Sequence, residues 1–296
     1  RVLTDSIAVL QHQGLISLET IGHDGMRVRA SAGSGSFKRQ ATLQEYRDAA
    51  EAHVKAVAQQ EEDNTGDPRG QAARQRAARE KQKRGTNNGT QQRSEPRASV
   101  TDPESRRMKM ADGGIRPGFN VQFASDGDAQ VIVSVDVSSQ GSDSGLMRPM
   151  YQDVCDRYSV TPKHYLVDGG FGKKADVEIL ESNRTKVYSP LYREKKQLEQ
   201  GDDPYAARTN ESVGMAAHRQ RMGTSEGKAI YRRRAQIAEF PNAVCRNDGL
   251  YQFRVRGLVK TKSQTLWHAL AHNFRRFKTL VCPTSQRSYL EILMIT

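Results

Sequence analysis

Apolar and polar residues alternate along residues 16–31, which is the pattern of a strand with one buried face. Met26, Val28 and Ala30 form the apolar set, and polar or charged residues stand between them. The acid Asp24 lies just before these apolar positions. A strand that carries a carboxylate is therefore predicted near the beginning of the chain.

Two later segments share this period of two. Residues 118–127 alternate apolar and polar side chains, and valines occupy every second position across residues 131–137. Asp126-Gly127-Asp128 lies between them, and an Asp-Gly pair is a strong hairpin signal. We predict an antiparallel hairpin in which Asp126 and Asp128 are turn residues rather than ligands.

Apolar residues three and four positions apart predict a series of helices. The helix from residue 41 begins with Thr42 and Glu45 as a T-x-x-E capping box, and the helix from residue 225 is expected to end or kink at Pro241. The last helix should pack on the core through Leu266, Leu270, Phe274 and Phe277. The predicted helices span residues 2–14, 41–66, 71–84, 145–158, 173–182, 225–240 and 263–280.

Short strands at residues 163–168 and 186–191 complete the pattern. The order is a strand, a hairpin of two strands, and then helix, strand, helix and strand, with further helices after them. This order predicts an α/β fold with a mixed sheet flanked by helices, and it is the order of the ribonuclease H-like fold.

We expect five parts along the chain. Residues 1–40 hold an N-terminal helix and the first strand of the core, and residues 41–98 form a basic helical insertion with a flexible tether. Residues 99–191 carry the ribonuclease H-like core. Residues 192–224 are a polar connection, and residues 225–296 add C-terminal helices that complete the core.

The composition adds a strong positive charge to this picture. The 296 residues include 46 Lys and Arg against 34 acids, a net charge of +12, which favours a polyanionic partner. Nucleic acid is the leading partner class, although ribosome-associated and membrane-surface proteins share this balance. Only 36% of the residues are hydrophobic, so part of the chain is expected outside the core. No run approaches the roughly 18 apolar residues of a membrane span.

The cysteines and the chain start set further expectations. Cys155, Cys245 and Cys282 show no CxxC and no paired spacing with histidine, which argues against a zinc site or a disulfide framework and fits a reducing compartment. The chain begins at Arg1 without an initiator methionine, so we expect a piece of a longer protein.

Arginines and lysines gather where they could contact phosphate. Most of the residues that we assign to DNA binding lie in the insertion, and a solvated charged face remains the alternative interpretation. The residues assigned to DNA binding are Arg74, Arg76, Arg79, Lys83, Arg84, Arg254 and Arg256.

Residues 165–172 read YLVDGGFG, a strand that ends on Asp168 and continues into glycines. An Asp-Gly pair by itself predicts a plain turn. A carboxylate at the open end of a strand also suits catalysis, so both interpretations stay open for Asp168 at this point. Asp143, in SDSG, is expected to cap the helix that follows it rather than to bind a metal.

Several segments together resemble the DDE transposases of bacterial insertion sequences, and more narrowly the class whose third motif reads Y-x2-R-x3-E. The resemblance runs from about residue 14 to about residue 280. It is interrupted by the helical insertion, which one branch of that family also carries after the first strand. In chain order the segments are HDGMRVRASAG, GFNVQ, SDSGLM, YLVDGGFG, YRRRAQIAE, RNDGLYQFRVRGL and the helix with ALAHN.

The resemblance implies a triad of carboxylates on a ribonuclease H-like core. The DG of the first strand falls on Asp24, the D-x-G-[FY] motif on Asp168, and the helical acid of the third motif on Glu239. Tyr231 and Arg234 match the Tyr and Arg that precede this acid. The resemblance gives both residues supporting roles, and a helix-surface salt bridge with packing is the alternative for them.

This chain departs from the family pattern at two points. Four residues, not three, separate Arg234 from Glu239. Arg246 stands where the family usually has a lysine one to two turns beyond the acid. Because of the changed spacing, Glu226 stays an alternative to Glu239 as the third acid.

The resemblance also implies Mg²⁺ as the cofactor, with two ions expected and Mn²⁺ as a substitute. Two such ions, roughly 3.5 to 4 Å apart, stabilise the attacking and leaving oxygens of a phosphodiester displacement, and hard cations prefer carboxylate oxygens. Asp24, Asp168 and Glu239 are the expected ligands. Arg234 is expected to contact the scissile phosphate or to orient Glu239, since its planar fork suits both roles.

The predicted function is that of a transposase that cleaves DNA at the terminal inverted repeats of its element and joins the freed 3′ hydroxyl to target DNA. The resemblance implies a homodimer on DNA, with no membrane association, in the bacterial cytoplasm at the nucleoid. Two alternatives stay open. One is a catalytically inactive or truncated transposase-derived DNA-binding protein, because family members generally carry a helical region before the first strand. The other is a ribonuclease H-like nuclease that only hydrolyses.

Overall fold

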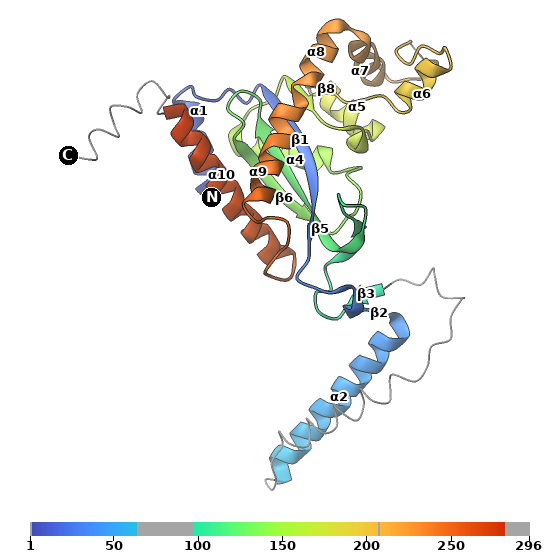
Figure 1. The fold of residues 1–296 in the computed structure, drawn as a ribbon, viewed down its shortest axis with the longest axis vertical. Helices are drawn as coiled ribbons and strands as arrows, with labels where there is room; N and C mark the ends of the chain where they lie inside the picture. The colour runs from blue at the N-terminus through green and yellow to red at the C-terminus, as the bar shows by residue number, and fades with distance from the viewer. Residues whose placement is uncertain (1, 64–96, 207, 282–296) are drawn as a thin grey trace, which may run out of the picture. The chain divides into compact units, whose positions relative to one another are not determined.

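A mixed sheet forms the centre of the larger of two structural units (Figure 1). The computed structural model describes residues 2–63, 97–206 and 208–281, which divide into Arg1–Ala32 with Glu104–Thr296 as one unit and Gly33–Pro103 as the other. The path through the sheet is β4 (Arg106–Lys109), β5 (Ile115–Asp126), β1 (Thr20–Arg29), β7 (His164–Leu166) and β8 (Lys186–Tyr188), and β6 (Ile132–Ser138) also pairs with β5.

The strand directions match the predicted order. β1 is antiparallel to β5 and parallel to β7, β5 is antiparallel to β6, and β7 is parallel to β8. The mixed α/β class is confirmed, and this arrangement is compatible with a ribonuclease H-like fold. The predicted hairpin of β5 and β6 is confirmed too. The carboxylate of Asp126 accepts hydrogen bonds from the backbone N–H groups of Leu18, Asp128 and Ala129, as expected of a turn residue.

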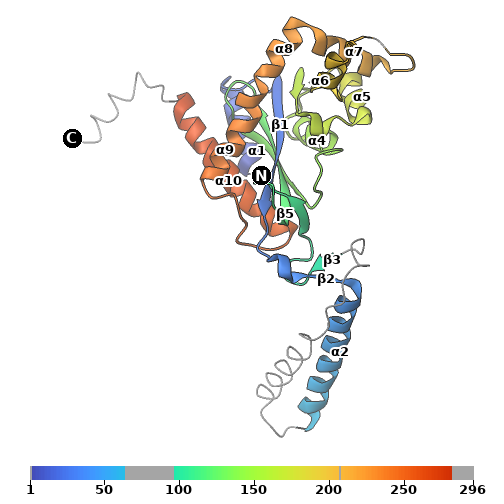
Figure 2. The same cartoon turned by 45° about the vertical axis from the view of Figure 1, so that its right-hand side comes forward.

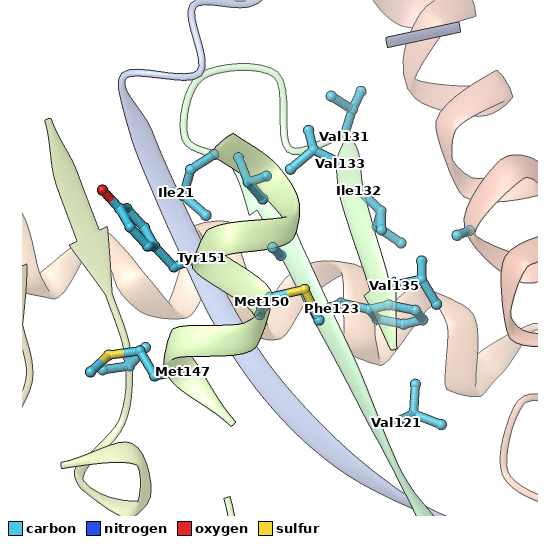
Figure 3. Packing of buried hydrophobic residues seen from close by; sticks show 14 of the residues in the cluster. Ile21, Val121, Phe123, Val131, Ile132, Val133, Val135, Met147, Met150 and Tyr151 are labelled. Carbon is cyan, nitrogen blue, oxygen red and sulfur yellow. The ribbon is translucent and has the colours of Figure 1, made fainter. Parts of the chain in front are cut away.

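Helices cover both faces of the sheet (Figures 1 and 2). α4 (Met147–Tyr158) lies on one face, where Met147, Met150 and Tyr151 belong to the same buried cluster as Ile21 and Phe123 (Figure 3). α9 (Phe240–Asn247) and α10 (Leu258–Val281) contact β1, β5 and β6 on the other face. α1 (Val2–His12) contacts α4 and β6. Successive residues of β1 therefore alternate between the α4 face and the α9 face.

Residues 192–224 hold more structure than the expected polar connection. α5 (Lys174–Ser182) contacts α7 (Val213–Gly223), and both α7 and α8 (Ser225–Arg232) contact β8. α6 (Glu194–Glu199) lies between β8 and α7 in the chain. Arg219 packs inside in this part because it is paired with Glu211. Arg219 is 5% exposed and its guanidinium lies 2.5 Å from Oε1 of Glu211.

Side chains form hydrogen bonds with the backbone N–H and C=O groups of one residue on each of two outer strands, β6 and β8. Asn273 of α10 donates to the carbonyl of Ile132 on β6 and accepts from its N–H, at 2.7 Å each. At the other edge, Val187 of β8 donates to Glu181 and accepts from Arg221, at 2.8 Å each.

The apolar face predicted for the last helix is only partly correct. Leu270 is buried, and Leu266 and Phe277 pack partly against the core. Phe274 is 64% exposed and lines an apolar hollow with Val9 and Leu10 of α1. The buried side of α10 consists mainly of small or hydrogen-bonding residues, because it lies on backbone groups at the edge of β6: Thr261, Thr265, Ala269, His272 and Asn273.

The helical segment does not end at Pro241, as one form of the prediction had it, but it is irregular just before this residue. A π-helical turn, Ala235–Glu239, follows α8, and α9 continues from Phe240 to Asn247. Pro241 lies in the first turn of α9, where a proline is tolerated because the missing N–H would have no intrahelical partner. The π-helical turn thus restarts the helix just before the proline.

In the smaller unit, residues 33–63 and 97–103 are described, and they include a two-stranded ribbon and a long helix. A short 3₁₀ turn (Ser34–Ser36) leads into β2 (Phe37–Arg39), which pairs antiparallel with β3 (Arg97–Ser99). α2 (Gln40–Asp63) begins directly after β2, so Thr42 lies inside the helix and the predicted capping box is wrong. The reason is that the helix starts as soon as the ribbon pairing stops.

The second predicted helix of the insertion, residues 71–84, lies outside the described residues. The same holds for the assigned DNA contacts Arg74, Arg76, Arg79, Lys83 and Arg84. Within the described ranges, no helix is long and apolar enough to cross a membrane.

Candidate functional site

Asp24 lies on β1, and Asp168 lies two residues beyond the end of β7, the strand that pairs with β1 in parallel. The last pair of these strands is Gly22 opposite Leu166, each two residues before one of the acids, and the charge of Asp168 acts on Asp24. Alternation along β1 brings the Asp24 side chain toward the face covered by α9. The pairing of the two strands thus brings together acids from distant parts of the chain.

Asp168 also makes the turn that its Asp-Gly sequence predicts. Its Oδ1 accepts a hydrogen bond of 2.7 Å from the backbone N–H of Gly170, and it caps the 3₁₀ turn Gly169–Phe171. This bond fixes one carboxylate oxygen and the direction of the chain after the strand. The turn and the site therefore use the same residue.

Asp24 is largely buried, and its surroundings act on its charge in opposite directions. Burial raises the pKa of Asp24 to about 6, the guanidinium of Arg234 opposes the rise, and the nearby carboxylate of Asp168 adds to it. Asn242 of α9 donates a 2.9 Å hydrogen bond to Oδ2 of Asp24 and favours the ionised form. The site therefore holds a carboxylate whose charge is costly unless cations lie beside it.

Arg234 joins Asp24 to Glu239. Its Nη2 donates to Oε1 of Glu239 at 2.5 Å, and its Nη1 lies 3.8 Å from Oδ1 of Asp24. The π-helical turn makes the first contact feasible, because residues five positions apart face the same side of a π-helix, whereas an α-helix aligns residues three and four apart. The extra residue between Arg234 and Glu239 is therefore absorbed by the π-helical turn.

Gly22 allows this turn to lie directly on β1. A Cβ at position 22 would come within 2.6 Å of Cγ2 of Ile237 and 3.2 Å of Cβ of Ala238. Both residues belong to the π-helical turn and are buried. The glycine two positions before Asp24 thus brings Glu239 close to the strand that carries Asp24.

Tyr231 lies beside the same charged groups. The guanidinium carbon of Arg234 is 6.0 Å from the centre of the Tyr231 ring. Burial raises the pKa of the Tyr231 hydroxyl, Arg234 lowers it, and the charges of Asp168 and Glu239 add to the rise. The structure therefore brings together Asp24, Asp168, Tyr231, Arg234 and Glu239.

An open groove of about 420 Å³ runs past Asp24 and Glu239. Arg246 lines it together with Asp24, Glu239 and Asn242, and Lys109 of β4 lines another part. Neither cation has an ion-pair partner within the described ranges. The groove is therefore flanked by unneutralised positive charge next to the carboxylates.

Other residues assigned from the sequence lie elsewhere. Glu226 is exposed in the first turn of α8, and its charge acts on Tyr188 of β8. Arg254 and Arg256 are exposed, and Arg256 donates to the backbone carbonyl of Ser31, beyond the end of β1. Glu239 rather than Glu226 is thus the helical acid connected to Asp24.

Asp143 does not cap the helix that follows it, contrary to the prediction. α4 begins after Leu146 without a side-chain cap. The Asp143 carboxylate instead accepts hydrogen bonds from Arg27, Asn120 and Gln122. These partners outcompete the local backbone because they surround the carboxylate with donors in a buried place.

Asn242 and Asp143 are the site-forming residues that sequence reasoning missed. Their partners lie far away in the chain, 218 residues for Asn242 with Asp24 and 116 for Asp143 with Arg27. Neither stands in a short motif of metal or catalytic residues. The one local signal was the SDSG segment that holds Asp143, and it also reads as a cap.

The donor chemistry of the site fits a hard divalent cation. Asp24 and Asp168 offer carboxylates that interact with each other, and Oδ1 of Asn242 is buried with no hydrogen-bond partner in the described part of the chain. In that same part, no three His, Cys, Asp or Glu side chains are arranged as a ligand set. Glu239, the third acid, is paired with Arg234.

Comparison with known proteins gives one family match. Residues 196–278 match the family described as Transposase DDE domain, a segment that holds Arg234, Glu239 and the groove residues of α9. No curated protein and no solved structure matches the chain. The match supports a DDE transposase, with transposase activity and DNA as the partner that this activity implies.

Proposed function

We propose that this chain is a transposase that cleaves DNA at the ends of an insertion sequence and transfers the strand into target DNA in a metal-dependent reaction. The observation that supports the proposal is the interaction of the Asp24 and Asp168 carboxylates, each of which follows the last paired residue of β1 and β7 by two positions. The family match supports it from an independent part of the chain.

Asp24, Asp168 and Glu239 are the proposed catalytic acids, and they would hold Mg²⁺, or Mn²⁺ in its place. A pair of such ions stabilises the charge that develops on the attacking and leaving oxygens of a phosphodiester. Glu239 would exchange its partner Arg234 for this role. The proposal thus assigns the Arg234–Glu239 contact to the ion-free protein.

Arg234 would then be free to contact the scissile phosphate. Its two terminal nitrogens lie between Asp24 and Glu239, which places a planar fork of donors where charge accumulates. Tyr231 packs beside this guanidinium and would orient it. Arg246 and Lys109, which line the groove, would contact neighbouring phosphates of the strand.

The DNA partner would be the terminal inverted repeats followed by target DNA, bound by a homodimer in the bacterial nucleoid. Arg254, Arg256 and the basic residues of the insertion would add phosphate contacts. The narrower class with a Y-x2-R-E third motif is part of the same proposal, since the π-helical turn keeps Arg234 and Glu239 in contact despite their longer spacing.

A cleavage assay tests the proposal. The protein is incubated with labelled DNA from the element ends and either Mg²⁺ or Mn²⁺, and nicking and strand joining are measured for wild type and for Asp24→Asn, Asp168→Ala and Glu239→Gln. We expect each variant to lose at least 100-fold in rate, since metal-bound carboxylates stabilise the transition state directly. Asp128→Asn is the control, because Asp128 is an exposed turn residue.

The remaining outcomes separate the alternatives. Equal cleavage by wild type and Asp168→Ala overturns the assignment of the acids. DNA binding with steep salt dependence but without cleavage identifies a DNA-binding protein without activity. Nicking without strand joining identifies a nuclease that only hydrolyses.

A further inference from the structure

A network of buried polar side chains lies on the face of β1 opposite to the Asp24 side chain. Because β1 alternates, His23, Gly25 and Arg27 face the side that α4 covers, while Asp24 faces α9. β5 contributes Asn120 and Gln122 on that same side, since Gly25 pairs with Gln122 and Arg27 with Asn120. His23 and Asn120 are 0% exposed, Gln122 is 1% and Asp143 is 8% exposed.

The hydrogen bonds of this network run in one direction and end on Asp143. Oε1 of Gln122 can only accept a hydrogen bond, so the His23 ring carries an N–H on Nε2. That N–H, on Nε2, donates to Oε1 of Gln122 at 2.8 Å, and Nδ1 accepts from the hydroxyl of Tyr165 at 3.1 Å. The amide nitrogen of Gln122 then donates to Asn120 and Asp143.

Asp143 is the acceptor at the centre of the network. Its Oδ1 accepts from Asn120 at 2.8 Å and from Gln122 at 3.0 Å, and its Oδ2 accepts from Arg27 at 2.8 Å. All three partners are donors, so only a carboxylate completes the set. Burying such a group costs free energy that a well-packed apolar core would avoid, so stability alone does not account for it.

The network lies next to glycines that follow the two proposed catalytic acids: Gly25 directly after Asp24, and Gly170 two residues after Asp168. After Asp24, a Cβ at Gly25 would lie 2.4 Å from Nε2 of Gln122 and 2.6 Å from Oδ1 of Asp143. After Asp168, a Cβ at Gly170 would lie 3.7 Å from Oδ2 of Asp143.

The residues on the other side of the acids join the same network. His23, immediately before Asp24, bonds to Tyr165 on β7, and its ring centre lies 4.5 Å from that of Phe171. Tyr165 precedes Asp168 and Phe171 follows it, so one network holds the two strands together at the level of the two acids.

We infer that Asp143 is a positioning residue that sets the spacing of Asp24 and Asp168 for binding divalent cations. This inference rests on the proposed function. Asp143 acts through the backbone beside each acid and through His23, and it does not itself contact the reacting atoms. The network acts on Asp24 through Gly25 and on Asp168 through Gly170, because these glycines lie next to its side chains.

The test measures Mn²⁺ affinity of the DNA-free protein by calorimetry, together with single-turnover cleavage at saturating DNA. Asp143→Asn turns one acceptor into a donor that faces donors, and we expect Mn²⁺ affinity and the cleavage rate to fall about 10- to 100-fold, as for partners of metal ligands. Affinity for DNA without metal should not change. The double variant Asn120→Asp with Asp143→Asn restores one carboxylate to the network and should recover most of the loss.

Glu211→Gln is the matched control. It breaks the Glu211–Arg219 ion pair, whose side chains are 9% and 6% exposed, comparable to the 9% of Asp143. Thermal unfolding confirms that each variant is folded at the assay temperature. If Asp143→Asn and Glu211→Gln lower the melting temperature alike and both leave Mn²⁺ affinity and cleavage rate unchanged, the inference is overturned.

Asp168→Asn separates this inference from the proposed function. If Asp168→Asn weakens Mn²⁺ binding and Asp143→Asn does not, the positioning role fails and the proposed function stands. If Asp168→Asn also binds Mn²⁺ as wild type does, the proposed metal site itself fails.

Discussion

The guanidinium of Arg234 and the carboxylate of Glu239 lie 2.5 Å apart although five positions separate them in the chain. In a regular α-helix each residue advances the direction of the side chain by about 100°. The one extra residue between Arg234 and Glu239 would therefore turn the Glu239 side chain away from Arg234. The π-helical turn Ala235–Glu239 restores the contact and keeps Glu239 next to β1. Helical bulges of this kind are frequent at functional sites.

Shortening this turn should preserve the site. Deleting Gln236 leaves three residues between Arg234 and Glu239, so a regular α-helix would bring the two side chains together. We expect the deletion variant to fold and to cleave DNA within about tenfold of wild type. Inserting one alanine after Gln236 should rotate Glu239 away and abolish cleavage. Equal rates for deletion and insertion would refute the role of the turn.

The cleavage rate should fall both when the positive charge of Arg234 is removed and when another cation replaces it. Arg234→Met removes the cation between Asp24 and Glu239, and we expect cleavage to fall at least 100-fold. Arg234→Lys should recover only part of the rate, because an ammonium group cannot form the planar fork. Arg233→Met is the control, since Arg233 is exposed and contacts only the turn around Asp128. Single-turnover cleavage with Mn²⁺ checks all three, and a full rate for Arg234→Met contradicts the assignment.

Gly22→Ala should separate the π-helical turn from β1. The new methyl group would meet Ile237, so we expect a loss of about 1–3 kcal/mol in the free energy of unfolding. Ile237→Ala removes the clashing group at its own cost. The double variant should therefore be more stable than the sum of the two single effects predicts. Urea unfolding measures this coupling, and strict additivity would show that the two residues do not touch.

The prediction from sequence succeeded where a pattern is local or rests on strand order. The alternation in β1 and the hairpin around Asp126 gave the strands, and the strand order brought Asp24 and Asp168 to adjacent strands. The contacts of Asp143 and Asn242 could not be predicted, because they depend on how the strands and α9 pack. Phe274 was misplaced for a related reason. Periodicity indicates which residues share a helix face, but not whether the neighbouring surface is apolar or consists of backbone groups.

A fall in pH should lower the free energy of unfolding of the larger unit, because His218 is buried there in its neutral form. Burial lowers the pKa of His218 to about 4, and its Nε2 lies 3.2 Å from Oγ of Ser189. In the unfolded chain the ring takes up a proton near pH 6.5, so protons favour unfolding as the pH falls from about 6.5 toward 4. We expect wild type to lose about 2 kcal/mol more stability than His218→Gln between pH 7 and pH 5. Urea unfolding at both pH values measures the difference, and parallel losses would contradict it.

The side chains at the sheet edges bear on how two copies of this chain can meet. Asn273 occupies both backbone groups of Ile132, and Glu181 with Arg221 occupies both backbone groups of Val187. A strand from another molecule would have to displace these side chains before it could pair at either position. Growth of the sheet from chain to chain is therefore blocked at these points. When copies gather on one DNA, neither β6 at Ile132 nor β8 at Val187 can therefore pair with a strand of a neighbouring copy while these hydrogen bonds persist.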